Sequence, residues 1–65
     1  MTVSPHEALV VPAKANIHSK PNATSPTVKA VRAGDSLRVM GETMTGWSLV
    51  DVQGKTGFIL STQIA

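Results

Sequence analysis

The chain is 65 residues long, which is enough for one domain but leaves that domain with a thin core. It contains no cysteine, so disulfide frameworks and thiolate metal sites are excluded. Its net charge is only +2, and it has one Trp, one Phe and no Tyr, which makes nucleic acid an unlikely partner because such binding needs basic patches and stacking aromatics.

The N-terminal residues carry little folding information. We expect residues 1–7 to form a flexible segment and residues 8–65 to form the folded domain. The start lacks a basic stretch, and its apolar run from Ala8 to Val11 is only four residues long. No other segment approaches the length needed to cross a membrane, so we expect neither a signal peptide nor a membrane partner.

Strand signals dominate the rest of the chain. Prolines at positions 5, 12, 21 and 26 interrupt the first half, and no apolar spacing of helical period is sustained. Short runs rich in β-forming residues recur between turn residues, which predicts an all-β barrel or sandwich of five or six short antiparallel strands. The predicted strands are Ala8 to Val11, Ala15 to His18, Val28 to Arg32, Leu37 to Met40, Trp47 to Val52 and Thr56 to Leu60.

The longest break between predicted strands runs from Ser19 to Thr27. Its two prolines and its Ser, Thr and Asn residues predict an ordered, exposed loop that loses little entropy on binding. Together with Met44 to Trp47, this loop is the expected rim of any ligand site. Lys20, Asn22 and Thr24 are its candidate contact residues.

A two-residue turn at Gln53-Gly54 fixes the register of the last hairpin. Because side chains alternate along a strand, one side of this hairpin is predicted to carry Trp47, Leu49, Phe58 and Leu60, and the other Ser48, Val50, Val52 and Ile59. Both sides are apolar. The first set is expected either to face outward as a contact surface for another subunit or partner, or to fold Trp47 and Phe58 over the barrel end and complete the core.

Three motifs in this order resemble the bacterial Src-homology-3 (SH3b) family over roughly residues 15–64. Asn16 to Pro21 (NIHSKP) is similar to the family's opening, Ala33 to Val39 (AGDSLRV) to its turn and strand, and Gly46-Trp47 with Gly54 to Ile59 (GKTGFI) to its terminal hairpin. The resemblance implies an SH3-like barrel. It also implies an extracytoplasmic or cell-wall-associated setting.

Alternation and the resemblance together predict the core and the C-terminal turn. The expected core residues are Val10, Ile17, Val31, Leu37, Val39, Val50 and Ile59, and a 3₁₀ turn is expected near Ser61 to Gln63.

The chain departs from the family's pattern mainly in its aromatic residues. Lys20 replaces a usual Gly, Ser48 stands where an aromatic is common, Phe58 replaces a second Trp, and no Tyr occurs near Gln63. The aromatic ligand surface implied by the family is therefore depleted here.

The sequence offers few residues that could serve in catalysis or bind a metal ion. His6, Glu7 and His18 are the main candidate donors, and no third His or Cys completes a metal set, so no metal and no cofactor is expected. The sequence lacks a G-x-S-x-G nucleophile elbow, and an enzyme is not expected. Asn22 to Thr24 matches a glycosylation sequon but is interpreted as a polar turn, and Gly34, Gly46, Gly54 and Gly57 are interpreted as turn and bulge glycines.

The sequence therefore favours a non-catalytic binding or assembly module that contacts a protein partner or a second copy of itself. The alternative is a module that targets a larger secreted protein to cell-wall peptidoglycan, an idea that rests on the family resemblance. A nucleic-acid binder is the least favoured interpretation.

Overall fold

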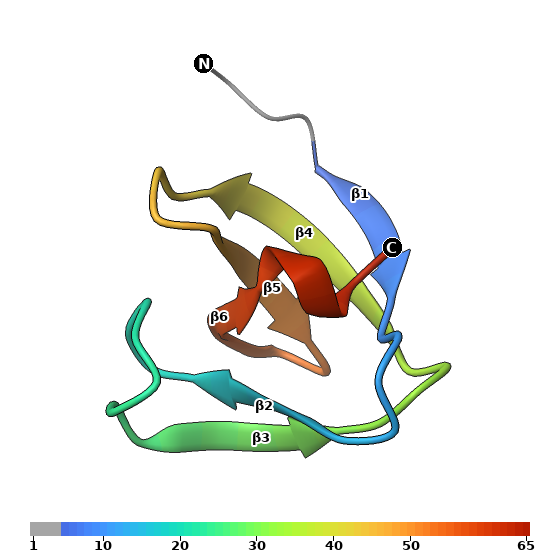
Figure 1. Cartoon of the computed structure of the whole chain (residues 1–65). Helices are drawn as coiled ribbons and strands as arrows, with labels where there is room; N and C mark the ends of the chain where they lie inside the picture. The colour runs from blue at the N-terminus through green and yellow to red at the C-terminus, as the bar shows by residue number, and fades with distance from the viewer. Residues whose placement is uncertain (1–4) are drawn as a thin grey trace.

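A computed structural model describes residues 5–65 as six strands and one 3₁₀ turn (Figure 1). The elements are β1 (His6–Leu9), β2 (Ala15–His18), β3 (Thr27–Val31), β4 (Ser36–Glu42), β5 (Trp47–Val52), β6 (Lys55–Leu60) and the turn η1 (Ser61–Gln63). Every strand pairing is antiparallel, in the order β1-β4-β5-β6-β2-β3. The predicted all-β fold and the predicted turn at Ser61 to Gln63 are thus confirmed.

The first strand begins earlier than residue 8. His6 and Glu7 pair with Val39 and Arg38 of β4, so these two residues belong to the barrel and not to a flexible segment. The backbone hydrogen bonds of the β1–β4 ladder extend the strand beyond the short apolar run visible in the sequence. Residues 1–4 of the expected N-terminal segment lie outside the described residues.

The end of the chain joins the start of the barrel. Leu9 and Ala65 exchange two backbone hydrogen bonds of 2.9 Å, and Val11 N donates to Gln63 O at the same distance. Val10 also forms an isolated bridge with Ile64. The C-terminal residues therefore cover one edge of β1 beside the turn η1 (Figure 1).

The β5–β6 hairpin has the predicted register. Trp47 pairs with Leu60 and Leu49 with Phe58, and the pairing continues to Val52 with Lys55. Gln53 and Gly54 both have positive φ, 51° and 82°, which is the type I′ geometry that matches the twist of a hairpin.

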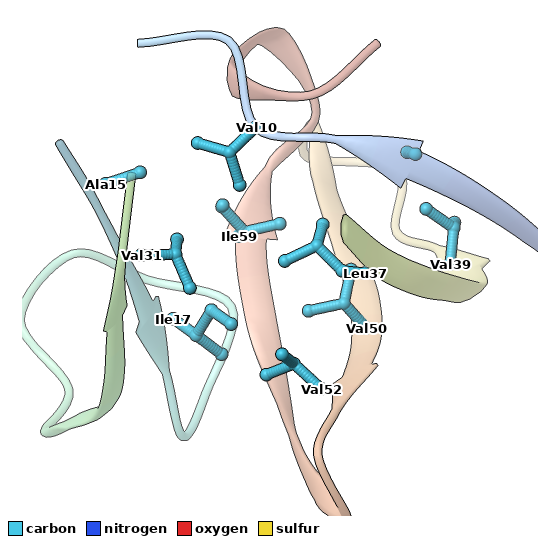
Figure 2. Close-up of a cluster of buried hydrophobic side chains, with 10 residues drawn as sticks. Val10, Ala15, Ile17, Val31, Leu37, Val39, Val50, Val52 and Ile59 are labelled. Carbon is cyan, nitrogen blue, oxygen red and sulfur yellow. The ribbon is translucent and has the colours of Figure 1, made fainter. Parts of the chain in front are cut away.

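Every residue predicted to belong to the core is buried. Figure 2 shows these side chains converging between β2 and β3 on one side and β4, β5 and β6 on the other. The buried apolar residues are Ala8, Val10, Ala15, Ile17, Val31, Leu37, Val39, Trp47, Val50, Val52 and Ile59. Ser48 is the buried polar exception at 0% exposure, and its Oγ lies 2.7 Å from Ser61 Oγ. This hydrogen bond satisfies both hydroxyls and ties η1 to β5.

Gly57 has a different role from the predicted turn or bulge. It lies inside β6, buried, with no positive φ. A Cβ at this position would lie 2.5 Å from Ile17 Cγ2 and 2.7 Å from His18 O. The residue is therefore glycine because β2 crosses it at close range.

We expect Gly57→Ala to destabilise the barrel by about 1 to 3 kcal/mol, because the backbone of β2 must move to admit a methyl group. The measurement is urea unfolding followed by the fluorescence of the single tryptophan. Gly41→Ala is the matched control, since a Cβ there meets nothing within 4 Å. Equal stability of the two variants would contradict the close-approach explanation.

Candidate ligand-binding groove

The loop between β2 and β3 is held by one serine. Ser25 Oγ lies 2.8 Å from Asn22 O and 3.1 Å from Lys20 O, and it accepts a 3.3 Å hydrogen bond from Lys20 N. The base of the loop is closed by Ser19 N donating to Pro26 O at 2.9 Å. The predicted ordered loop is confirmed, with Ser25 as its internal brace.

His18 connects this loop to the barrel. Its Nδ1 lies 2.9 Å from Ser25 O, and its ring meets the Trp47 ring edge-on, with centroids 5.7 Å apart and an interplanar angle of 84°. An edge-to-face contact of this geometry is favourable for aromatic pairs. The half-buried imidazole thus has one nitrogen on the loop and its ring against the tryptophan.

Trp47 is held from the opposite side by the loop between β4 and β5. Thr43 Oγ1 accepts from Trp47 N at 3.2 Å, and Thr43 N donates to Trp47 O at 2.8 Å. Gly46 O accepts from Ser61 N at 2.9 Å, which links the same loop to η1. The tryptophan therefore starts β5 in a fixed position between two loops and the turn.

The expectation that Trp47, Leu49, Phe58 and Leu60 form a fully outward patch needs correction. Trp47 is only 9% exposed and the other three are half-buried. The register is as predicted, but Trp47 packs against His18 and does not stand in solvent. The alternative in which large side chains complete a thin core describes Trp47 better.

A shallow groove of about 260 Å³ opens where these elements meet. We call it the His18–Trp47 groove. Its walls come from the segment before β2, from β2, from the tip of the loop and from the start and end of the last hairpin. The lining residues are Lys14, Ala15, Asn16, His18, Ala23, Trp47, Leu60 and Gln63.

The groove brings together part of the predicted site. Trp47 and Leu60 line it, while Lys20, Asn22 and Thr24 lie exposed on the adjacent loop. In that loop Thr24 Oγ1 donates to Asn22 Oδ1 at 3.0 Å. Figure 1 shows the β2–β3 and β4–β5 loops on the same side of the barrel, but of the predicted rim Met44 to Trp47 only Trp47 lines the groove.

Leu49 and Phe58 do not line the groove, but they lie next to Trp47 and Leu60 on the same, outer face of the β5–β6 hairpin. They pair with each other across β5 and β6, and Leu49 also pairs with Gly41 next to the β4 bulge. Met40 at this bulge is 41% exposed. These three side chains make an apolar row, which we call the outer row.

Sequence reasoning missed several lining residues. Lys14, Asn16, Ala23 and Gln63 carried no distinguishing motif, and Ser25 was one of many hydroxyl residues in its loop. Their positions depend on how β2 and η1 dock on β5 and β6. A local pattern does not contain that long-range arrangement.

Most of the acidic residues lie on another face. A larger groove of about 570 Å³ is lined by Glu7, Asp35 and Asp51 and by three basic side chains, Lys29, Arg32 and Arg38. Glu7 and Asp51 flank Arg38 as cross-strand neighbours on β1 and β5. Within residues 5–65, no group of three His, Cys, Asp or Glu side chains could hold a metal ion. The same residues contain no helix long and apolar enough to cross a membrane.

Comparisons with known proteins identify the fold. A family model described as "Bacterial SH3 domain" matches residues 13–64. The solved structure of NlpC2 from Trichomonas vaginalis aligns with a TM-score of 0.87 and 21% identity, over 95% of this chain and 23% of that one. NlpC1 from Trichomonas vaginalis aligns with a TM-score of 0.85 and 24% identity, over 94% of this chain and 22% of that one. No curated protein matches. At these identities the two structures show the fold alone, and this chain spans less than a quarter of either.

We expect Ser25→Ala to loosen the rim of the groove while leaving the barrel folded. Removal of its hydroxyl frees Lys20 N, so the exchange of that amide should accelerate roughly two- to tenfold. Hydrogen exchange measured by NMR gives this rate. Ser19→Ala, in the same loop but outside the Ser25 hydrogen bonds, should leave it unchanged. Unaltered Lys20 exchange in Ser25→Ala would show that the brace is unimportant.

Proposed function

Because the chain belongs to the bacterial SH3 domain family, we propose that it is a non-catalytic binding module whose ligand occupies the His18–Trp47 groove. The supporting observation is the fixed aromatic pair between two ordered loops. A preorganised rim loses little entropy when a ligand binds. The groove is below the roughly 300 to 1,000 Å³ of sites for drug-sized molecules, which favours one short stretch of an extended ligand.

The ligand that we favour is a peptide segment, and its leading source is the peptide portion of cell-wall peptidoglycan. The family resemblance supports this source. The groove supports it too, because its small Ala15 and Ala23 side chains and apolar Trp47 and Leu60 surfaces suit short side chains beside a backbone. Lys20, Asn22 and Thr24 are the loop positions from which additional contacts would come. A segment of a protein partner is the other source of the same chemistry.

We expect the wild-type chain to sediment with insoluble purified peptidoglycan and Ala23→Gln to be retained at least about tenfold less well, a loss of about 1.4 kcal/mol. Glutamine at this exposed position fills the groove without entering the core. Ala33→Gln, the same change at an exposed turn position outside the groove, should bind like the wild type. A wild type that stays in the supernatant would remove peptidoglycan as the ligand.

The outer row supports self-association as a second candidate. Leu49 pairs with Phe58 on β6 and with Gly41 on β4, and exposed Met40 precedes Gly41 at the β4 bulge. Exposed apolar clusters mark contact surfaces. The outer row borders the groove, because the Leu49–Phe58 pair follows the Trp47–Leu60 pair on the same face and Phe58 also pairs with His18.

We expect the light-scattering mass of the wild type to rise with concentration up to about 1 mM, the range of a weak contact of about 4 kcal/mol. Leu49→Lys should remain monomeric because it places a charge in the middle of the outer row. Thr56→Lys adds the same charge on the same face of β6, next to Asp51 and beyond the row, and should associate like the wild type. A monomeric wild type across this range would exclude self-association.

A further inference from the structure

The chain separates its charges along the sequence. No Asp or Glu occurs between Glu7 and Asp35, a stretch that includes β2, the braced loop and β3. All the charged side chains in this stretch are basic: Lys14, Lys20, Lys29 and Arg32. The hairpin that forms one wall of the His18–Trp47 groove is therefore uniformly basic.

The groove itself keeps this asymmetry. Its lining contains Lys14 and His18 and no carboxylate. Three of the four acidic residues line the larger groove of about 570 Å³ on the other face, and the fourth, Glu42, lies at the end of β4. A cationic ligand group in the His18–Trp47 groove would find no counter-charge, whereas an anionic group would find Lys14.

The hydrogen bond of His18 decides which of its ring nitrogens is open to a ligand. Ser25 O can only accept, so Nδ1 carries the proton of the 2.9 Å hydrogen bond. In that tautomer Nε2 carries a lone pair, so it can accept a hydrogen bond from a ligand but does not donate one. Asn16 and Gln63, whose amide groups can donate, are the other polar side chains of the lining.

The rest of the lining is apolar. Trp47 and Leu60 belong to the hairpin, and Ala15 and Ala23 come from β2 and the loop. A ligand that matches both the basic charge and the apolar surface of the groove carries a carboxylate within one residue of an apolar side chain. The small volume leaves room for that unit and little more.

We propose that the His18–Trp47 groove selects a peptide carboxylate, with the acid group at Lys14 beside the amides of Asn16 and Gln63, and the adjacent apolar side chain against Trp47 and Leu60. This inference rests on the proposed function, because it names the chemistry of the same groove. The carboxylate can be a chain terminus or an acidic side chain. Both give the same charge and the same hydrogen-bond acceptors.

The test is an NMR titration of the full chain with two pairs of short peptides. The first pair is N-acetyl-Ala-Leu-Ala with a free carboxylate and with a C-terminal amide. The second pair has an amidated end and contains either Glu or Gln in N-acetyl-Leu-X-Ala. We expect the Trp47 indole and His18 signals to shift, and the acid member of at least one pair to bind about tenfold or more tightly than its neutral partner. The pair that discriminates identifies the terminal or the side-chain carboxylate.

Two lysine variants locate the effect. Lys14→Gln should bring the acid and neutral peptides to within about twofold of each other. Lys55→Gln removes the same charge from the exposed end of the β5–β6 hairpin and should keep the full discrimination. Both lysines are exposed, so neither change disturbs the core.

The possible failures are distinguishable. Equal binding of acid and neutral peptides at Trp47 and His18 would overturn the carboxylate inference and leave the groove as a ligand site. No shift of these signals with any peptide would overturn both the inference and the proposed groove. Inorganic phosphate that binds there as tightly as the best carboxylate would reassign the groove to a phosphate polymer and overturn the peptide proposal.

Discussion

The close approach of β2 to Gly57 is the constraint on which the barrel and the groove both depend. Strands β1, β4, β5 and β6 form one continuous ladder, and within residues 5–65 the β2–β3 hairpin joins it at the His18–Phe58 pair. Ile17 and the carbonyl of His18 lie directly over Gly57. This contact buries Ile17 completely, and it fixes the backbone of the next residue, His18, whose ring meets Trp47.

The groove is thus a consequence of how the barrel closes. A side chain on Gly57 would push β2 away from β6 and move His18 relative to Trp47. The loop follows the same geometry, because His18 Nδ1 donates to Ser25 O and Ser25 Oγ holds Lys20 and Asn22. Core packing, loop order and the shape of the groove are therefore coupled through two adjacent residues of β2.

The sequence predicted what local patterns and alternation control. The Gln53-Gly54 turn determined the register of β5 and β6, and the family resemblance then identified the side of the hairpin with Val50 and Ile59 as core. It failed where the answer lay in long-range contacts. The sequence left open whether Trp47 faces outward or folds over the barrel end, and Trp47 is covered by His18 from a strand about 30 residues earlier. Gly57 was interpreted as a turn or bulge glycine, because nothing nearby in sequence indicates that β2 crosses it. The separation of charges, by contrast, was already present in the sequence and acquired meaning only when the groove was located.

The size of the domain explains why its binding surface takes this form. A barrel of this length has a small core, which is filled by its buried side chains and leaves no room for an enclosed pocket. Even a buried polar residue contributes to this surface. The hydroxyl of Ser48 hydrogen-bonds Ser61 in η1, and this turn places Gln63 at the edge of the groove. The proposed groove would then bind its ligand through a shallow surface with one aromatic pair and a bias of charge. A shallow contact of this kind is weak by itself, and it gains most when it is linked to a second binding event that raises the effective concentration.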